Sequence, residues 1–559
     1  MQDGTVLRGD LHRVERPEPL PTIVTRTPYG KQGAPVGTPV DGRTLIEAGF
    51  NIFVQDVRGR FSSAGQFDPY RQEIADGADT IDWVVNQPWS TDRVGMLGGS
   101  YVGATQWLAA KSGVKALQAI APTFTSADYY EGWSYQGGAL QLGFLLYWAL
   151  WGLLLGDEEH LRSHEDKEGL IDRVNTIDEL YIRRPAGRID YLDELAPYFQ
   201  QWLSHPTYDD FWTSVSPRSV TSVPSLNVGG WYDIFIEGTI ENYQRSASAR
   251  AQGGSPSHHQ LVIGPWSHSI HGGTFPEHDF GLRGGFEYVD LTRAHLDWFE
   301  RTLLDKDRGQ GAEPAVRYFV TGLNRWSSAS TWPPAGEDVE YFLHSKRGAN
   351  STQGDGVLSA EKPGSEREDL YIYDPLHPVP TVGGSTLLPG QRTAKNAGPR
   401  RQNAVESRMD VLCFTSQRLS ADVDVAGTVR ARVFFASSAV DTDVTIKLVD
   451  VDEADNAIVL CDNILRCRFR NSQAHAELLK PDEVNELLIT VGNIAHRFRP
   501  GHRIRLDISS SNFPRFLPNS NTGSDEATIG AADMKRAVNR VFHDEDHRSC
   551  LILPHVPRD

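Results

Sequence analysis

Strand patterns and helix patterns alternate over residues 1–125, and this alternation restricts the fold more than any other feature of the chain. The strand patterns are short apolar runs rich in β-branched residues: PTIVTRTPYG, NIFVQDVRG, RVGMLGG and ALQAIAPTF. The segments between them with helical spacing include EIADGADTIDWVVNQ and ATQWLAAKS. Such alternation is typical of a parallel α/β sheet with helices packed against it.

The pattern changes three times along the rest of the chain. Residues 126–220 are long helical stretches rich in Trp, Tyr, Leu and charged residues, and we expect a helical insertion there. Residues 221–308 resume the sheet with VPSLNVGGWYD, HQLVIGPWSHS and the helical LTRAHLDWFERTLLD. Residues 309–559 contain short alternating strands separated by turn residues, which indicates a jelly-roll β-sandwich. A chain of 559 residues exceeds what one core usually organises, so several domains are expected.

The amino-acid composition limits the kinds of molecule to which the protein can be expected to bind. A net charge of −18 opposes binding to nucleic acid or to an anionic membrane surface. The apolar run at residues 140–156 is slightly too short for a membrane span and is followed by charged residues, so we expect a buried helix. The four cysteines form no CxxC pair, and buried, reduced thiols in a cytoplasmic protein are expected: Cys413, Cys461, Cys467 and Cys550.

A serine lies at a strand-to-helix corner in the segment GMLGGSYVGATQWLAA. Such a corner lifts a hydroxyl above the sheet, and the N-terminus of the following helix favours developing negative charge, so Ser100 is a candidate nucleophile. The spacing here is G-x-S-Y-x-G, because the second glycine is Gly103, one residue later than in the usual G-x-S-x-G. An ordinary turn between a strand and a helix is the alternative for the corner by itself.

A serine nucleophile needs a base and an acid that orients the base. In α/β-hydrolases the acid and then the base follow the serine in the sequence, each at the carboxyl end of a strand. Asp233 ends the strand pattern VPSLNVGGWYD, and His268 follows the strand pattern LVIGPWS. We therefore predict a catalytic triad of Ser100, Asp233 and His268.

The segment SHSIHGG offers a competing interpretation as a metal site. His268 and His271 are three residues apart, and His278 and Asp279 lie downstream. The segment has no helical pattern and no Glu between its histidines, unlike common zinc motifs. We expect neither a metal ion nor another cofactor.

Six motifs spread along nearly the whole chain support the same triad: GGSYVGATQW, RTPYGK, DVRGRFSSAGQF, GGWYD, GPWSH and SSSNFPRFLPNSNTG. Together they resemble the CocE/NonD hydrolases, a group of serine hydrolases that includes cocaine esterases and X-Pro dipeptidyl peptidases. The resemblance is strongest to the cocaine esterase branch. It implies an α/β-hydrolase fold with an inserted helical cap and a C-terminal jelly roll. Members of this group have a further β segment before the stretch at which this chain begins, and we expect the difference to affect the sheet edge more than the chemistry.

An oxyanion hole needs two hydrogen-bond donors. The backbone N–H of Tyr101, directly after the nucleophile, is the first. The resemblance implies that the hydroxyl of Tyr29 is the second. It also implies that Trp133, Trp148 and Phe235 line an acyl pocket suited to an aromatic or bulky acyl group, whereas core packing is the alternative for the tryptophans.

We therefore predict a serine hydrolase that cleaves small-molecule carboxylic esters through an acyl-enzyme. An X-Pro dipeptidyl peptidase, an amino acid ester hydrolase and a β-lactam acylase stay open, as does a non-catalytic binding protein on the same fold. The amino acid ester hydrolases resembled here hold the substrate ammonium with a carboxylate cluster. No acid follows Tyr101 in this chain, but Asp128, Glu131 or Glu237 could replace it. A homodimer also stays open.

Overall fold

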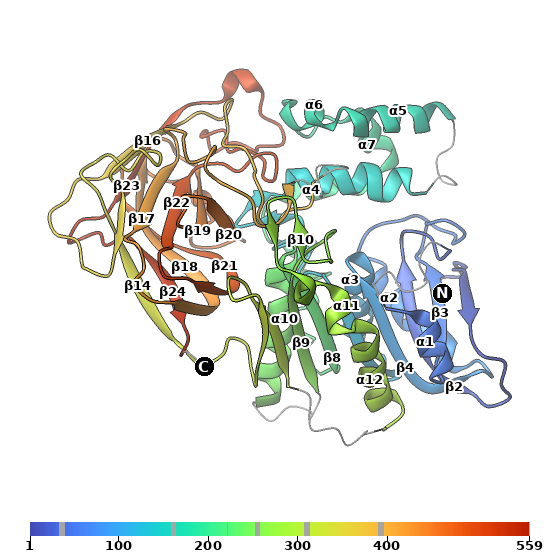
Figure 1. The fold of residues 1–559 in the computed structure, drawn as a ribbon. Coiled ribbons are helices and arrows are strands. Elements are labelled where there is room, and N and C mark those ends of the chain that lie inside the picture. The colour runs from blue at the N-terminus through green and yellow to red at the C-terminus, as the bar shows by residue number, and fades with distance from the viewer. Residues whose placement is uncertain are drawn as a thin grey trace.

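The computed structural model describes residues 1–32, 40–157, 164–220, 222–251, 258–306, 314–388 and 396–557. Figure 1 shows a sheet with flanking helices, a group of helices above it that includes α5, α6 and α7, and a β-rich part beside both. This arrangement confirms the predicted fold class of an α/β-hydrolase fold with a helical cap and a C-terminal β domain.

A mixed sheet organises the first part of the chain. Its order in the described residues is β1-β3-β2-β4-β5-β8-β9-β12-β13. The bounds are β1 (Gly9–His12), β2 (Leu20–Thr27), β3 (Asn51–Asp56), β4 (Ser90–Gly99), β5 (Leu117–Thr123), β8 (Ser225–Tyr232), β9 (His259–Ser267), β12 (Val316–Val320) and β13 (Arg325–Ala329). Neighbours from β3 to β12 are parallel, whereas the edge strands β1 and β13 are antiparallel to their neighbours.

Helices cover both faces of this sheet because successive side chains of a buried strand point to opposite sides. Leu97 of β4 is buried with α1 (Gly42–Glu47) and α12 (Leu291–Leu303), and the preceding Met96 is buried with α2 (Glu73–Val85) and α3 (Tyr101–Lys111). Helix α10 (Ile236–Ala251) packs on β8 and β9. Helices therefore hold the sheet from both faces.

Most of the cap is helical. Its elements are β6 (Tyr135–Gln136), β7 (Ala139–Leu140), α4 (Leu142–Tyr147), η1 (Trp148–Leu155), α5 (His164–Asn175), α6 (Ile177–Ile182), α7 (Asp190–Leu195), α8 (Pro197–Ser204) and α9 (Asp210–Thr213). The apolar run at residues 140–156 forms α4 and η1, and η1 is a π-helix of 8 residues whose side chains are mostly buried. In the part of the chain that the structure describes, no helix has the length and apolar composition needed to span a bilayer.

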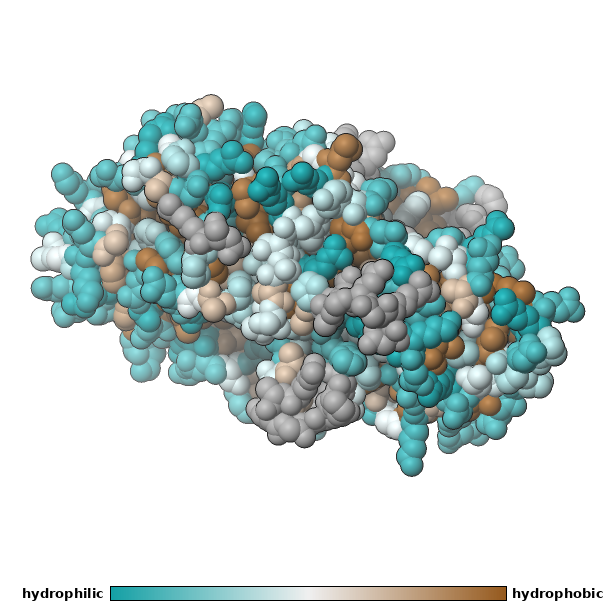
Figure 2. All heavy atoms as spheres, turned by 60° about the horizontal axis from the view of Figure 1, so that its bottom comes forward, coloured by the Kyte–Doolittle hydropathy of each residue, from teal (hydrophilic) through white to brown (hydrophobic). Residues whose placement is uncertain are grey.

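The C-terminal part is a β-sandwich. Its strands are β14 (Glu337–His344), β15 (Val357–Ser359), β16 (Asp369–Tyr373), β17 (Leu412–Ser416), β18 (Val423–Ser437), β19 (Asp443–Val451), β20 (Ala457–Arg466), β21 (Asn485–Phe498), β22 (Arg503–Ser509), β23 (Ala537–Phe542) and β24 (Cys550–His555). Alternate residues of β18 enter its core, namely Val429, Ala431, Val433 and Phe435. All four cysteines are free and buried, as predicted. Figure 2 shows mostly hydrophilic residues on one face of the molecule, with apolar residues in small groups between them.

The structure corrects the position of two strands. The sequence interpretation assigns everything after residue 309 to the jelly roll, but β12 pairs in parallel with β9, and β13 pairs with β12. Both strands therefore extend the first sheet. A short strand pattern does not reveal which sheet the strand joins, because pairing depends on contacts distant in the sequence. Residues 221 and 309, at two of the expected boundaries, lie outside the described residues.

Candidate active site

Ser100 occupies the sharp turn between β4 and α3, at φ 59° and ψ −125°. Non-glycine residues rarely adopt a positive φ, and the surrounding hydrogen bonds hold this one. Its backbone N–H donates to the Thr123 carbonyl at 2.9 Å, and its carbonyl accepts from Gly103 at 2.9 Å and Ala104 at 3.0 Å. The side chain is therefore held between the sheet and the first turn of the helix, as in a nucleophile elbow.

The unusual spacing of glycines around Ser100 has a steric explanation. Gly98 has φ +147°, and a Cβ atom at that position would lie 2.1 Å from Cγ1 of Val102. The turn brings residues 98 and 102 together, and one of them must lack a side chain. Here Gly98 provides that space, and so a valine can occupy position 102.

His268 links Ser100 to Asp233. Its Nε2 lies 3.1 Å from Oγ of Ser100, and its Nδ1 lies 2.7 Å from Oδ1 of Asp233. A carboxylate only accepts hydrogen bonds, so Nδ1 carries the proton and Nε2 is free to accept the hydroxyl proton of Ser100. Asp233 is fully buried, and its other carboxylate oxygen accepts from the backbone N–H of Phe235 at 3.2 Å. The three predicted triad residues are thus brought into one hydrogen-bonded chain.

The ends of β8 and β9 bring the acid and the base together. The two strands pair in parallel, but their register shifts between Gly230 and Tyr232, and such an irregularity redirects the chain beyond it. A Cβ atom on Gly230 would lie 2.4 Å from the Trp266 carbonyl, so this close approach requires glycine. Asp233 and His268 follow directly after the two strands, on adjacent positions of the sheet.

His271 supports the loop that carries His268. Its ring stacks against both Phe124 and Phe286, with ring centroids 5.3 Å and 4.4 Å away, and its Nε2 lies 3.2 Å from the His268 carbonyl. Burial lowers the pKa of His271 to about 4, so the ring is neutral near pH 7. His271 therefore holds the backbone of the base. Among the residues that the structure describes, no group of three or more His, Cys, Asp or Glu side chains is arranged to hold a metal ion.

Both predicted oxyanion donors lie next to Ser100. Tyr101 is the first residue of α3, where backbone N–H groups have no partner within the helix. Tyr29 follows β2, and its hydroxyl accepts a hydrogen bond from Nε1 of Trp148 at 3.0 Å. The Tyr29 residue is 37% exposed, but loss of water around its hydroxyl raises the pKa to about 12, while hydrogen bonds with Trp148 and Ser100 limit that increase.

The side chain of Tyr101 anchors the start of α3. Its hydroxyl donates to Glu73 at 3.0 Å and accepts from the backbone N–H of Tyr70 at 3.0 Å. Glu73 also pairs with the buried Arg26 at 2.5 Å. Burial raises the pKa of Glu73, and the neighbouring Arg26 opposes this effect. This buried network fixes the helix end that presents the Tyr101 N–H.

The three aromatic residues predicted to surround the acyl group form one connected cluster, and Phe235 contacts the His268 ring. Trp133 stacks on Phe235 with centroids 4.3 Å apart, and Phe235 meets the His268 ring edge to face at 5.3 Å. Trp148 meets Trp133 edge to face at 5.5 Å. All three aromatic side chains are buried, so they belong to the core and to the surroundings of the triad at once.

Two of the carboxylates considered for an ammonium site already have protein partners. Asp128 accepts from the hydroxyl groups of Tyr208 at 3.0 Å and Ser216 at 2.5 Å. Glu131 accepts from the side chain of Gln473, and burial raises its pKa to about 7. Neither carboxylate is therefore available as a simple replacement for an ammonium-binding cluster.

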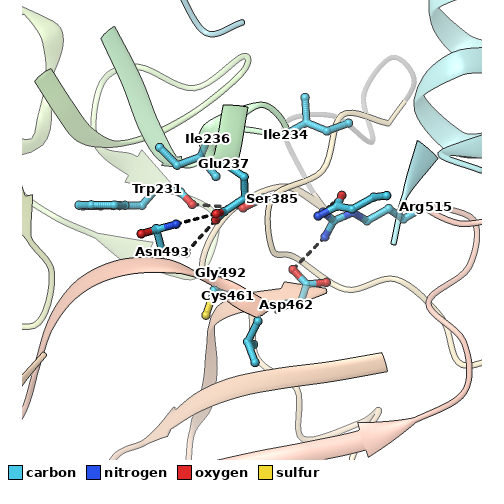
Figure 3. A pocket seen from close by; sticks show the side chains of 12 residues that line it. Trp231, Ile234, Ile236, Glu237, Ser385, Cys461, Asp462, Gly492, Asn493 and Arg515 are labelled. Carbon is cyan, nitrogen blue, oxygen red and sulfur yellow. Dashed lines mark hydrogen bonds and ion pairs between the residues drawn. The ribbon is translucent and has the colours of Figure 1, made fainter. Parts of the chain in front are cut away.

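The third carboxylate lies at the junction with the β-sandwich. Glu237 of α10 accepts from the backbone N–H of Asn493 at 2.8 Å and from its side-chain amide at 2.6 Å. Figure 3 shows Glu237 directed toward Asn493, beside the ion pair between Asp462 and Arg515. These residues line a small enclosed space between the α/β part and the sandwich. Glu237 thus joins two parts of the fold.

Several side chains near the site were not predicted from the sequence. Tyr70 and Trp202 join the aromatic cluster, Arg60 connects the Tyr29 turn to η1, and His271 supports the base. Arg60 lies in the motif DVRGRFSSAGQF, to which no role was assigned. That motif is a sequence signal that could have pointed to Arg60. Trp202 lies in a helical stretch, where the sequence pattern does not distinguish it from an ordinary core residue.

Two family models match most of the chain. Residues 3–270 match the family described as X-Pro dipeptidyl-peptidase (S15 family), and residues 309–552 match the X-Pro dipeptidyl-peptidase C-terminal non-catalytic domain. The chain is 36% identical to the cocaine esterase of Rhodococcus sp. (strain MB1 Bresler) over 573 aligned positions, which cover 100% of this chain and 97% of that protein. This chain belongs to the CocE/NonD family of serine hydrolases.

Solved structures of similar proteins show that this CocE/NonD hydrolase shares their fold over its whole length. An aminopeptidase from the marine sediment archaeon Thaumarchaeota archaeon superposes with a TM-score of 0.83 at 24% identity. An α-amino acid ester hydrolase superposes with a TM-score of 0.81 at 23% identity. Each comparison covers 100% of this chain and 95% of the other. The family predicted from the six sequence motifs is confirmed.

Proposed function

We propose that the protein hydrolyses carboxylic esters with an aromatic or bulky acyl group, using Ser100 as nucleophile, His268 as base and Asp233 as acid. The observation that carries the proposal is the hydrogen-bonded chain from Ser100 through His268 to the buried Asp233. Membership of a serine hydrolase family adds independent support.

The proposed reaction follows from the hydrogen bonds of His268, which leave Nε2 free to accept the hydroxyl proton of Ser100. His268 Nε2 removes the hydroxyl proton as Oγ of Ser100 attacks the acyl carbonyl, and Asp233 stabilises the imidazolium that forms. The Tyr101 N–H and the Tyr29 hydroxyl donate to the carbonyl oxygen as it becomes negative. His268 then protonates the departing alcohol, leaving an acyl group on Ser100. Water, activated by the same base, releases the acid and restores the serine.

The two oxyanion donors make the largest contribution to the rate in the proposed reaction. Removal of one such donor typically lowers kcat by about 10² to 10³. Tyr29 supplies a hydroxyl whose pKa of about 12 keeps it protonated at neutral pH, so that it donates without losing its proton. The helix that begins at Tyr101 adds a partial positive charge at the same place.

The surroundings of His268 support an apolar acyl group. Phe235 meets the His268 ring edge to face, and Trp133 stacks on Phe235; there the two rings would meet the acyl part of a substrate bound to Ser100. Aromatic pairs of this geometry contribute roughly 0.5 to 1.5 kcal/mol beyond the area that they bury. An aromatic acyl group would extend this cluster.

Hydrolysis of a peptide or amino acid derivative is the second candidate, since the matching family descriptions name X-Pro dipeptidyl peptidases. A substrate with a free ammonium group close to the acyl carbon would need a carboxylate near Ser100. Asp128, Glu131 and Glu237 are engaged by protein donors, and this favours esters without an ammonium group. A β-lactam acylase differs from an esterase in its leaving group and not in its triad.

The test compares four substrates: p-nitrophenyl acetate, a benzoyl ester, an amino acid ester and Gly-Pro-p-nitroanilide. Each is incubated with the wild type, with Ser100→Ala and with the matched control Ser112→Ala at the opposite end of the same helix. We expect the benzoyl ester to have the highest kcat/KM, Ser100→Ala to be inactive and Ser112→Ala to match the wild type. A fluorophosphonate should label the wild type and Ser112→Ala but not Ser100→Ala.

Other outcomes replace the proposal in defined ways. Cleavage of the Gly-Pro amide alone would establish an X-Pro dipeptidyl peptidase. Preference for the amino acid ester would establish an amino acid ester hydrolase. Retention of ester hydrolysis in Ser100→Ala would remove Ser100 from the mechanism. A wild type that neither hydrolyses these substrates nor reacts with the fluorophosphonate would be a binding protein on a hydrolase fold.

A further inference from the structure

The hydroxyl of Tyr29 accepts a hydrogen bond from the indole of Trp148. Nε1 of Trp148 lies 3.0 Å from the Tyr29 oxygen. An indole N–H can only donate, and a phenol has one proton and acceptor capacity for the donor, so the direction of this bond is unambiguous. The Tyr29 oxygen accepts from Trp148, and the Tyr29 proton remains for another acceptor.

The proposed function supplies that acceptor, namely the carbonyl oxygen of a bound ester. The Ser100 side chain lies near enough to the Tyr29 hydroxyl to lower its pKa, and His268 Nε2 accepts the Ser100 proton. The Tyr29 proton is therefore left for the oxygen of a carbonyl attacked by Ser100, which would develop its negative charge beside the serine. Donation from Trp148 also stabilises negative charge on the Tyr29 oxygen and so strengthens the Tyr29 O–H as a donor.

The indole of Trp148 is held in place by its own helix. Trp148 begins the π-helix η1, and π-helices are rare and frequent at functional sites. A Cβ atom on Gly152 would lie 2.8 Å from Cδ1 of the indole, so the ring occupies the space that this glycine leaves. Trp202 stacks on the indole, with centroids 5.7 Å apart and ring planes 7° from parallel.

Arg60 connects the two elements that carry Tyr29 and Trp148. Its buried guanidinium donates to the Pro28 carbonyl at 2.9 Å, directly before Tyr29, and to the Leu153 carbonyl of η1 at 2.6 Å. One cation thus bonds to the backbone of both elements. The distance between the Tyr29 turn and η1 is fixed independently of the bond from Trp148 to Tyr29.

We propose that Trp148 is a positioning residue of the oxyanion hole, whose indole N–H orients and strengthens the Tyr29 hydroxyl. This inference rests on the proposed function, because it assumes that Tyr29 donates to the substrate. It differs from a role in the acyl pocket, since a pocket residue acts through its volume and through the size of the acyl group. An orienting donor acts on every acyl group alike.

The test uses two esters of different size. Trp148→Phe keeps an aromatic ring but removes the N–H. Trp107→Phe is the matched control, because Trp107 is also buried, packs in a separate core cluster, and has an indole N–H without a hydrogen-bond partner among the described residues. For both p-nitrophenyl acetate and the benzoyl ester we expect Trp148→Phe to lower kcat about fivefold to tenfold, the usual effect of one lost hydrogen bond, with KM nearly unchanged. Trp107→Phe should change kcat for both esters by less than about twofold.

A double-mutant cycle identifies the partner. In a Tyr29→Phe background, which has no hydroxyl to orient, Trp148→Phe should lower kcat by less than about twofold. Gly152→Ala provides a second route, because its methyl group must displace the indole from Tyr29. It should lower kcat for both esters, and this loss too should disappear in the Tyr29→Phe background. If Trp148→Phe does not fold, Gly152→Ala still decides the question.

Failure of the inference is distinct from failure of the proposed function. A wild type without esterase activity and without fluorophosphonate labelling overturns the proposed function and, with it, this inference. An active wild type in which Trp148→Phe affects only the benzoyl ester assigns Trp148 to the acyl pocket and overturns the inference alone. An equal loss with and without the Tyr29 hydroxyl overturns it as well.

Discussion

Replacement of Gly98 by alanine tests the steric account of the nucleophile turn. The new Cβ atom would lie 2.1 Å from Cγ1 and 2.8 Å from Cβ of Val102, at a residue with φ +147°. The backbone conformation costs a non-glycine residue on the order of 1 to 3 kcal/mol, and a buried overlap of this kind typically costs about 1 to 3 kcal/mol more. We expect Gly98→Ala to lower the free energy of unfolding by about 2 to 6 kcal/mol in total.

The two contributions can be separated. Gly113, near the other end of α3, has φ +74°, and a Cβ atom added there would meet nothing within 4 Å, so Gly113→Ala carries only the backbone cost. Val102→Gly removes the overlap, because the next neighbour of the Cβ at position 98 is the residue 102 carbonyl at 3.5 Å, an ordinary contact. The double variant Gly98→Ala, Val102→Gly should therefore recover about 1 to 3 kcal/mol relative to the sum of its single changes.

Two measurements follow these variants: urea denaturation gives the free energy of unfolding, and the rate of fluorophosphonate labelling reports the position of Ser100. Gly98→Ala should slow labelling at least about tenfold, because a displaced Oγ loses its alignment with His268. The reasoning is wrong if Gly98→Ala costs no more than Gly113→Ala. It is also wrong if the coupling between positions 98 and 102 is smaller than about 0.5 kcal/mol.

Three further predictions concern buried polar groups. Tyr101→Phe leaves Glu73 and a backbone N–H without their partner and should lower the free energy of unfolding in urea by about 1 to 3 kcal/mol. Asn493→Ala removes a donor from the half-buried Glu237 and should lower the free energy of unfolding by a similar amount of about 1 to 3 kcal/mol, whereas an unchanged urea midpoint would contradict this role. Burial raises the pKa of Glu131 from 4.5 to about 7, so protonation of this carboxyl favours the folded state. The contribution of Glu131 to the free energy of unfolding is therefore fully present below pH 4.5 and is lost as the pH rises through 7. Glu131→Gln should match the wild type in thermal unfolding at pH 4.5 and be more stable by at most about 3 kcal/mol at pH 8, and equal stability at both pH values would refute the assignment.

The proximity of Ser100, Asp233 and His268 could be predicted because each of them lies at the end of a recognisable strand. The runs before Ser100, Asp233 and His268 are apolar and short, and the carboxyl ends of parallel strands meet at one edge of a sheet. Their order in the chain then restricts their roles. The structure adds the 3.1 Å and 2.7 Å separations that make this order a connected hydrogen-bond path.

Other features could not be predicted because they depend on which segments become neighbours. The strands β12 and β13 have the local pattern of the sandwich but pair with the first sheet. Asp128, Glu131 and Glu237 are carboxylates with no local sign of their partners, which lie far away in the sequence. The periodicity of apolar residues along the sequence indicates which side chains are buried, but it does not identify the residues that they contact.

The layered fold, the family and the proximity of Ser100, Asp233 and His268 can be predicted from the amino-acid sequence, because strand periodicity, glycines at the corner and chain order are local properties. The bond from Trp148 to Tyr29 needed the folded chain, since 119 residues separate the two and no pattern encodes the direction of an indole N–H. The same holds for Arg60, which joins two backbone carbonyls from separate elements. Contacts of this kind arise from the packing of the cap on the sheet, which brings a π-helix over the turn after β2.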